Sequence, residues 1–225
     1  MDDLFETHDA LAVGQLVRTG ELGARELLDG TLARLRTLNE SLNAITDLYD
    51  GDLLETSVAR AGDGPFRGVP FLVKQLMADC AGTPTTVGSR FFATEPVAAA
   101  DSAAVARMRR AGLVIVGRTN TSEFGLAPTT EPAFGGSTLN PWGEGLSPGG
   151  SSGGSAAIVA ARAKIVEGAV LMVREAIEAL EGGTDGHDSI PLDSDRKATF
   201  ASNLMTVIAS DHPTTPVVNV GTLSR

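Results

Sequence analysis

The sequence predicts an α/β fold, because a strand, a helix and a second strand follow one another near its centre. Residues 69–74 form a compact apolar run that ends in a lysine, as a buried strand does. Residues 101–111 have a helical pattern with an Asp-Ser start, and residues 113–117 are rich in β-branched side chains. This order predicts a βαβ unit within an α/β sheet.

The chain before this unit predicts a helical cap over the core. Two amphipathic helices are expected at residues 9–18 and 24–38. In the second helix, leucines recur at three- and four-residue steps on one face, at Leu27, Leu28, Leu32, Leu35 and Leu38. A short strand over residues 42–48 and a helix over residues 53–61 follow. We expect no chemistry in this part.

Loops follow each of the two central strands. Residues 81–90 are rich in Gly, Pro and Thr, and residues 129–147 predict a long polar loop that packs over a site. Asn120, Glu123 and Phe124 begin a loop and a short helix. We interpret Glu123 as a carboxylate at a helix start, which the helix dipole favours, and not as a catalytic group.

A glycine- and serine-rich stretch at residues 146–160 reads L-S-P-G-G-S-S-G-G-S-A-A-I-V-A. Composition alone allows a flexible linker or a phosphate-binding loop. A phosphate loop would carry a lysine after the second glycine pair, where this chain has Ser155 and Ala156. A linker seldom leads directly into an apolar helix. We expect Ser155 to cap the helix that follows, through its hydroxyl.

Together with the segments before it, this stretch resembles the amidase signature family. The supporting segments are G-V-P-F-L-V-K (68–74), A-G-T-P-T-T-V-G-S-R (81–90), D-S-A-A-V-A-R-M-R-R-A-G (101–112), V-G-R-T-N-T-S-E-F-G (116–125) and G-S-T-L-N-P-W (136–142). Their order and spacing match the family over most of residues 1–162. The resemblance implies a mixed sheet surrounded by helices, of which this chain holds the N-terminal part. It also implies hydrolysis of carboxamide C–N bonds without metal or cofactor.

Enzymes of this family use a lysine, a serine on a cis peptide bond and a second, nucleophilic serine. The resemblance places the lysine at Lys74 and the cis-serine at Ser151, within hydrogen-bond reach of each other. Gly149, Gly150 and Ser152 are then expected to bind the substrate, a small amide. A lysine acts as a base near neutral pH only if burial or positive charge lowers its pKa from about 10.4. Otherwise Lys74 is a solvated strand end.

The nucleophile of the family is missing from its expected place. A turn of the form D-x-G-G-S-I-R-x-P should follow Ser151 by about two dozen residues, since its serine attacks and its amides bind the oxyanion. Here the helical pattern continues to residue 182, with Glu175 near that position. A weaker match, G-T-D-G-H-D-S-I-P at residues 183–191, carries Ser189 but lacks the paired glycines. We expect a catalytically incomplete amidase or, alternatively, a non-catalytic fusion or truncated protein.

Residues 163–225 resemble the C-terminal tail of bacterial members of the stomatin–prohibitin–flotillin superfamily. In those proteins the tail follows a membrane-associated domain and takes part in assembly. A second helix is predicted at residues 194–209 and a strand-like end at residues 217–220. The sequence therefore predicts two parts, residues 1–162 and 163–225, and possible self-association.

Composition excludes several classes of function. The net charge of −10 and a pI of about 4.7 argue against a nucleic-acid partner. No apolar run approaches the roughly 18 residues of a membrane span, and the N-terminus is acidic. The single cysteine, Cys80, cannot form an internal disulfide, so we expect a cytoplasmic protein with Cys80 packed in the core. The three histidines lack the spacing of metal ligands: His8, His187 and His212.

Overall fold

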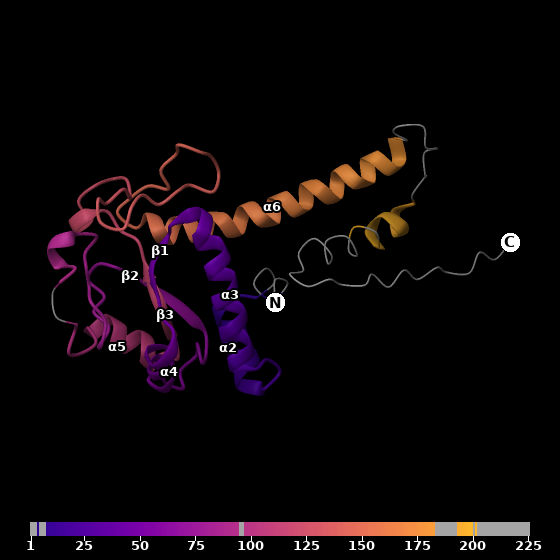
Figure 1. Cartoon of the computed structure of the whole chain (residues 1–225). Helices are drawn as coiled ribbons and strands as arrows, with labels where there is room; N and C mark the ends of the chain where they lie inside the picture. Colours follow the sequence, from indigo (N-terminus) through magenta and orange to yellow (C-terminus); the bar gives the residue numbers. More distant parts are fainter. Residues whose placement is uncertain (1–3, 5–7, 95–96, 183–192, 200, 202–225) are drawn as a thin grey trace. The chain divides into compact units, whose positions relative to one another are not determined.

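The computed structural model describes residue 4 and residues 8–94, 97–182, 193–199 and 201. The chain divides into two compact units, residues 8–164 and residues 1–7 together with 165–225. The first unit holds the sheet (Figure 1), and its residue range includes Lys74 and Ser151. Ser189 and the predicted strand at residues 217–220 lie outside the described residues.

A three-stranded mixed sheet forms the centre of residues 8–164, in the order β1-β3-β2. Strand β2 (Pro70–Lys74) is parallel to β3 (Val114–Thr119), with Lys74 opposite Thr119. Strand β1 (Ile45–Leu48) is antiparallel to β3. All six residues of β3, the central strand of the sheet, are buried. The parallel pair confirms the predicted βαβ unit.

Helices pack against this sheet through their apolar faces. Helix α3 (Ala24–Leu42) contributes three of its leucines to the core, while α4 (Gly51–Ala59) and α5 (Ala103–Arg110) contribute one buried apolar side chain each. Figure 1 shows α3 on one side of the strands and α5 on the other. The core members are Leu28, Leu32, Leu35, Ile45, Tyr49, Leu54, Val73, Cys80, Val105, Val114, Ile115 and Val116. Cys80 is thus a packed core residue, as predicted.

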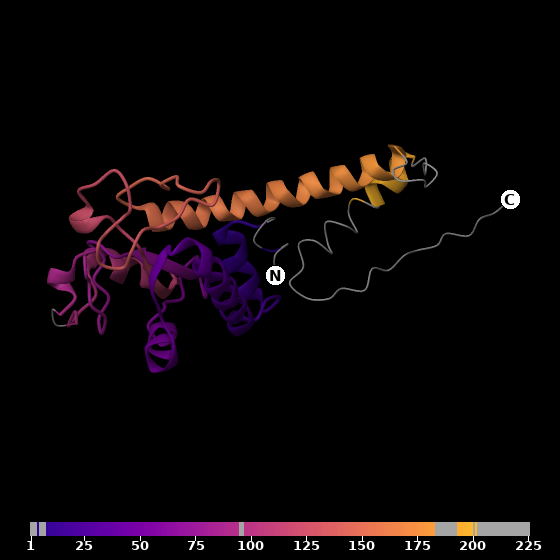
Figure 2. The same cartoon turned by 45° about the horizontal axis from the view of Figure 1, so that its top comes forward.

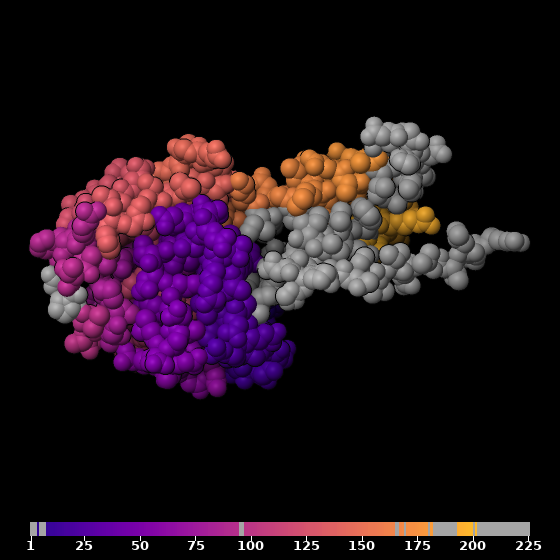
Figure 3. Space-filling view, viewed as in Figure 1, coloured from indigo at the N-terminus to yellow at the C-terminus, as the bar shows by residue number. Residues whose placement is uncertain are grey.

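The predicted helix starts are confirmed by their caps. The Asp9 carboxylate accepts from the Ala12 amide at 2.8 Å and begins α2 (Ala10–Thr19). The Ser102 hydroxyl accepts from the Val105 amide at 3.4 Å and begins α5. Each cap satisfies a backbone amide that the helix leaves without a partner. Figure 3 shows the segment from α2 to α4, in indigo and purple, across the middle of one face of this unit.

The predicted strand at residues 42–48 was wrong at its start. Helix α3 continues to Leu42, and Asn43 ends it in a left-handed conformation with φ of 47°. Leu42 is buried with Ala44, Ala157 and Ala161, so its helical position is fixed by tertiary packing. The strand begins only at residue 45.

Short 3₁₀ helices and one long helix complete the described chain. They are η1 (Arg90–Phe92), η2 (Glu123–Gly125) and α6 (Gly153–Gly182). The loop between η2 and α6 lies beside the start of α6 (Figure 2). Helix α6 runs through Glu175, which confirms that this position is helical and not a turn. Of the helix predicted at residues 194–209, residues 194–199 are described and are helical.

Candidate active site

Lys74 and Ser151 meet at the carboxyl end of β2. The Lys74 Nζ donates a hydrogen bond to the Ser151 Oγ over 2.6 Å, although the two residues are 77 positions apart in sequence. Burial lowers the pKa of Lys74 below its ordinary value of 10.5, because desolvation disfavours the ammonium form. A half-buried lysine at this distance from a hydroxyl can exchange a proton with it. The structure therefore brings together the two residues predicted to be catalytic.

The loop that carries Ser151 is held close to the backbone of residues 127–129. A Cβ atom on Gly150 would lie 2.6 Å from the Ala127 carbonyl oxygen and 2.7 Å from the Pro128 carbonyl carbon. No side chain fits in that space, which explains glycine at this position. The peptide bond between Gly150 and Ser151 is cis, as predicted.

Thr130 ties both ends of this loop together. Its Oγ1 donates to the Gly149 carbonyl at 2.9 Å and accepts from the Gly153 amide at 3.0 Å. Thr130 is fully buried, so these bonds are shielded from water. The backbone of Ser151 is held separately, because its carbonyl accepts from the Ser122 amide at 3.3 Å.

The start of α6 rests on the end of β3. The Gly154 amide donates to the Asn120 carbonyl at 3.3 Å. Ser155 was predicted to cap this helix, and that prediction was wrong: the helix already begins at Gly153. The Ser155 hydroxyl instead pairs with the Thr119 hydroxyl, with 2.9 Å between the oxygens. A serine hydroxyl at this place can bond either a free amide of its own helix or a group from another segment. Here it bonds the second kind of group, because β3 lies nearby.

Sequence reasoning missed a buried polar run that supports the site. Residues 119–122, T-N-T-S, begin with the last residue of β3 and are all 2 % exposed or less. The Asn120 side chain donates to the Gly136 carbonyl and to the Thr138 hydroxyl, each at 3.0 Å. A run of four polar residues that starts at the end of a buried strand was the signal that could have indicated their role.

The other predicted site residues line the same loop. Gly149 and Gly150 contribute backbone next to Ser151, and the exposed Ser152 accepts from the Ala156 amide at 3.1 Å through its carbonyl. Their contact with a substrate stays a prediction. Glu123, expected at a helix start, is the first residue of η2 and accepts from the Ser89 hydroxyl at 2.7 Å.

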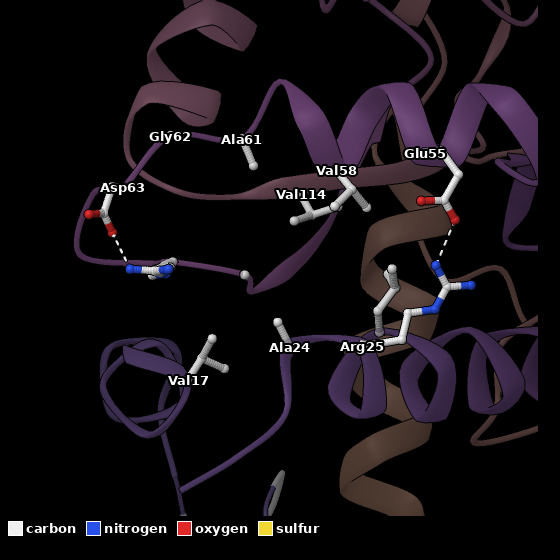
Figure 4. Close-up of a pocket in the computed structure, with 12 residues that line it drawn as sticks. Val17, Ala24, Arg25, Glu55, Val58, Ala61, Gly62, Asp63 and Val114 are labelled. Carbon is white, nitrogen blue, oxygen red and sulfur yellow. Dashed lines mark hydrogen bonds and ion pairs between the residues drawn. The ribbon is translucent and has the colours of Figure 1, made fainter. Parts of the chain in front are cut away.

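A separate pocket of about 580 Å³ lies away from these residues (Figure 4). Its walls come from α2, α3, α4, the segment after α4 and the start of β3. Val17, Val58 and Val114 are among the apolar side chains that line it. Ion pairs flank it: Arg25 with Glu55 at 2.6 Å and Arg67 with Asp63 at 3.0 Å. None of the residues predicted for the site lines this pocket.

Neither metal ligands nor a membrane span emerge from the described part of the chain. Within residues 8–94, 97–182 and 193–199, no three His, Cys, Asp or Glu side chains gather as metal ligands would. Among these residues, no helix combines the length and the apolar character that crossing a bilayer requires.

Comparison with known proteins shows the family to which the chain is related. A family model described as Amidase matches residues 26–167. The 6-aminohexanoate-cyclic-dimer hydrolase of Paenarthrobacter ureafaciens is 44% identical over 161 residues, which cover 71% of this chain and 32% of that protein. The same enzyme of Pseudomonas sp. (strain NK87) is 43% identical over 161 residues, again covering 71% of this chain and 32% of the relative. A glutamyl-tRNA(Gln) amidotransferase component of Synechococcus sp. (strain CC9311) is 39% identical, covering 65% of this chain and 31% of the relative.

Solved structures give the same relationship. A structure of 6-aminohexanoate cyclic dimer hydrolase superposes with a TM-score of 0.64 at 42% sequence identity, covering 69% of this chain and 32% of that chain. The present chain thus spans about a third of the length of the curated relatives that it matches. Since the family model covers more than half of its residues, the chain belongs to the amidase signature family.

Proposed function

We propose that Lys74 and Ser151 are the base and the proton relay of a site for hydrolysing carboxamide C–N bonds. The 2.6 Å hydrogen bond between them carries this proposal, because proton transfer needs heavy atoms about 2.6–3.2 Å apart. The lowered pKa of Lys74 supports it, since a larger fraction of the amine is unprotonated near neutral pH. The substrate is a small amide that contacts Gly149, Gly150 and Ser152, and no metal or cofactor takes part.

We also propose that this chain by itself is catalytically incomplete. Hydrolysis through an acyl-enzyme needs an attacking hydroxyl and amides that bind the oxyanion. The sequence lacks the D-x-G-G-S-I-R-x-P turn that supplies both in the family. Direct attack by Ser151 would lose about 10²–10³ in rate for each missing oxyanion donor. The site then keeps its base and its relay but has no efficient nucleophile.

A panel of small amides tests whether the chain is catalytically incomplete. Purified protein is incubated with aliphatic, aromatic and cyclic amides, and the released amine or ammonia is measured. We expect no turnover above that of Lys74→Ala and Ser151→Ala, with Lys164→Ala as a matched lysine control. Clear turnover that both site variants abolish and the control retains would refute incompleteness. If Ser189→Ala also abolished it, Ser189 would be the nucleophile.

The base itself is tested without turnover. The chain has three lysines, at positions 74, 164 and 197, so lysine-selective ¹³Cε labelling gives three side-chain signals. Lys74→Arg assigns the signal of Lys74. We expect Lys74 to lose its proton at a pH below its ordinary pKa of 10.5, because burial lowers that pKa. A titration midpoint of Lys74 at its ordinary pKa would contradict its role as a base.

A non-catalytic role remains the alternative, and the resemblance of residues 163–225 to an assembly tail favours it. In this proposal residues 1–162 and 163–225 have different origins, and the second part promotes association. Deleting residues 165–225 would then abolish association in sedimentation experiments and leave a folded unit.

Two features of composition support the proposed surroundings of the protein. The single buried Cys80 supports a protein of the reducing cytoplasm, and the net charge of −10 supports one without a nucleic-acid partner.

A further inference from the structure

Lys74 and Ser151 are carried by two segments that dock separately on the end of β3. Lys74 ends β2, which pairs with β3 along its length. Ser151 precedes α6, whose first turn rests on Asn120 through the Gly154 amide. The distance between the Lys74 Nζ and the Ser151 Oγ therefore depends on how both segments are fixed to β3.

Thr119 is the residue of β3 that contacts both segments. Its carbonyl accepts from the amide of Gln75, the residue after Lys74, at 3.0 Å. Its hydroxyl pairs with the Ser155 hydroxyl at 2.9 Å, and Ser155 lies four residues after Ser151. Thr119 is only 2 % exposed, so water cannot easily replace either bond. One buried residue thus joins the lysine side of the site to the serine side.

We propose that Thr119 is a positioning residue that sets the approach of Ser151 to Lys74 through its hydroxyl pair with Ser155. Removing the Thr119 hydroxyl leaves its carbonyl bond to Gln75 intact but leaves the Ser155 hydroxyl without this partner. The first turn of α6, and the loop joined to it, then lose their side-chain link to β3. The relevance of this link to catalysis rests on the proposed function, whereas the geometry can be tested without any reaction.

The test measures how strongly Ser151 and Lys74 are coupled. The ¹³Cε signal of Lys74 is titrated with and without Ser151→Ala, first in the natural chain and then in Thr119→Val. In the natural chain we expect Ser151→Ala to move the titration midpoint of Lys74 by about half a pH unit, as loss of one hydrogen bond would. In Thr119→Val we expect that shift to fall to less than half of its original size.

Thr121→Val is the matched control, because Thr121 is also a fully buried threonine of the same segment and its hydroxyl bonds only the Ser122 carbonyl. It should leave the coupling unchanged, and Thr119→Ser, which keeps the hydroxyl, should restore it. Should Thr119→Val fail to fold, Ser155→Ala removes the other half of the pair and must weaken the coupling equally.

Three results would overturn the inference or its basis. Full coupling in Thr119→Val, or in Ser155→Ala, would refute the positioning role alone. An equal loss in Thr121→Val would indicate general loosening of the segment and would also refute it. No effect of Ser151→Ala in the natural chain would instead contradict the proposed function, because Lys74 and Ser151 would not interact in solution.

Discussion

Gly154→Ala should strongly destabilise residues 8–164, because the start of α6 lies directly on the backbone of the sheet and its flanking loop. A Cβ atom at position 154 would lie 2.3 Å from the Ala44 carbonyl oxygen and 2.5 Å from the Asn120 amide nitrogen. A Cβ atom does not approach non-bonded backbone atoms closer than about 3.0 Å, so α6 must move away. Both neighbours are backbone atoms, and neither can rotate aside.

The size of the effect follows from what this movement breaks. The Gly154 amide is already 3.3 Å from the Asn120 carbonyl, so a further separation removes this hydrogen bond, worth about 1 kcal/mol. Overpacking a rigid contact adds about 1–3 kcal/mol. The better helix propensity of alanine returns at most about 1 kcal/mol. We expect the free energy of unfolding to fall by about 1–4 kcal/mol.

Urea unfolding followed by far-UV circular dichroism and by the fluorescence of Trp142, the single tryptophan, measures this change. Gly168→Ala is the matched control, because the same substitution in the same helix meets no atom within 4 Å. It should cause no loss and gain up to about 1 kcal/mol. A soluble Gly154→Ala protein within about 0.5 kcal/mol of the natural chain would refute the close fit between α6 and β3.

Three further predictions concern charge and association. Because the pKa of Lys74 is lower in the folded chain, the free energy of unfolding should rise with pH between that lowered pKa and the unfolded value of about 10.4. Lys74→Met should remove this rise in urea unfolding at several pH values, and the same dependence on pH in the variant would contradict the prediction. In the natural chain the buried Arg118 donates to the neutral Gln75 oxygen at 2.8 Å, and the Nε of Arg118 has no partner among the described residues, so Gln75→Glu should stabilise the chain by about 1 kcal/mol near pH 7. A lower stability of the variant in calorimetry would show that the cost of burying the carboxylate exceeds the gain from the ion pair. The purified chain should self-associate, because β2 is an edge strand of the described sheet and its Phe71 side chain is 38 % exposed. A compact monomer in light scattering at high protein concentration would contradict this prediction.

Local pattern was enough to predict most elements of residues 8–164. A few neighbouring residues were enough to predict three elements: β2 from the apolar run before Lys74, α5 from its Asp-Ser start, and β3 from its β-branched residues. The resemblance to the amidase signature family added Lys74, Ser151 and the cis peptide bond, all of which the described structure brings to one place. Helix and strand periodicity are properties of contiguous sequence, and for that reason they could be predicted without the fold.

Contacts between distant segments were decided only by the tertiary structure. The end of α3 at Leu42 depends on packing against Ala157 and Ala161 of α6, more than 100 residues away, which periodicity within α3 cannot reveal. Ser155 satisfied the local rule for a helix cap, yet its hydroxyl bonds Thr119 because α6 starts two residues earlier and rests on β3. A hydroxyl or a glycine fits several local roles equally well, and the partner that selects one of them comes from another part of the chain.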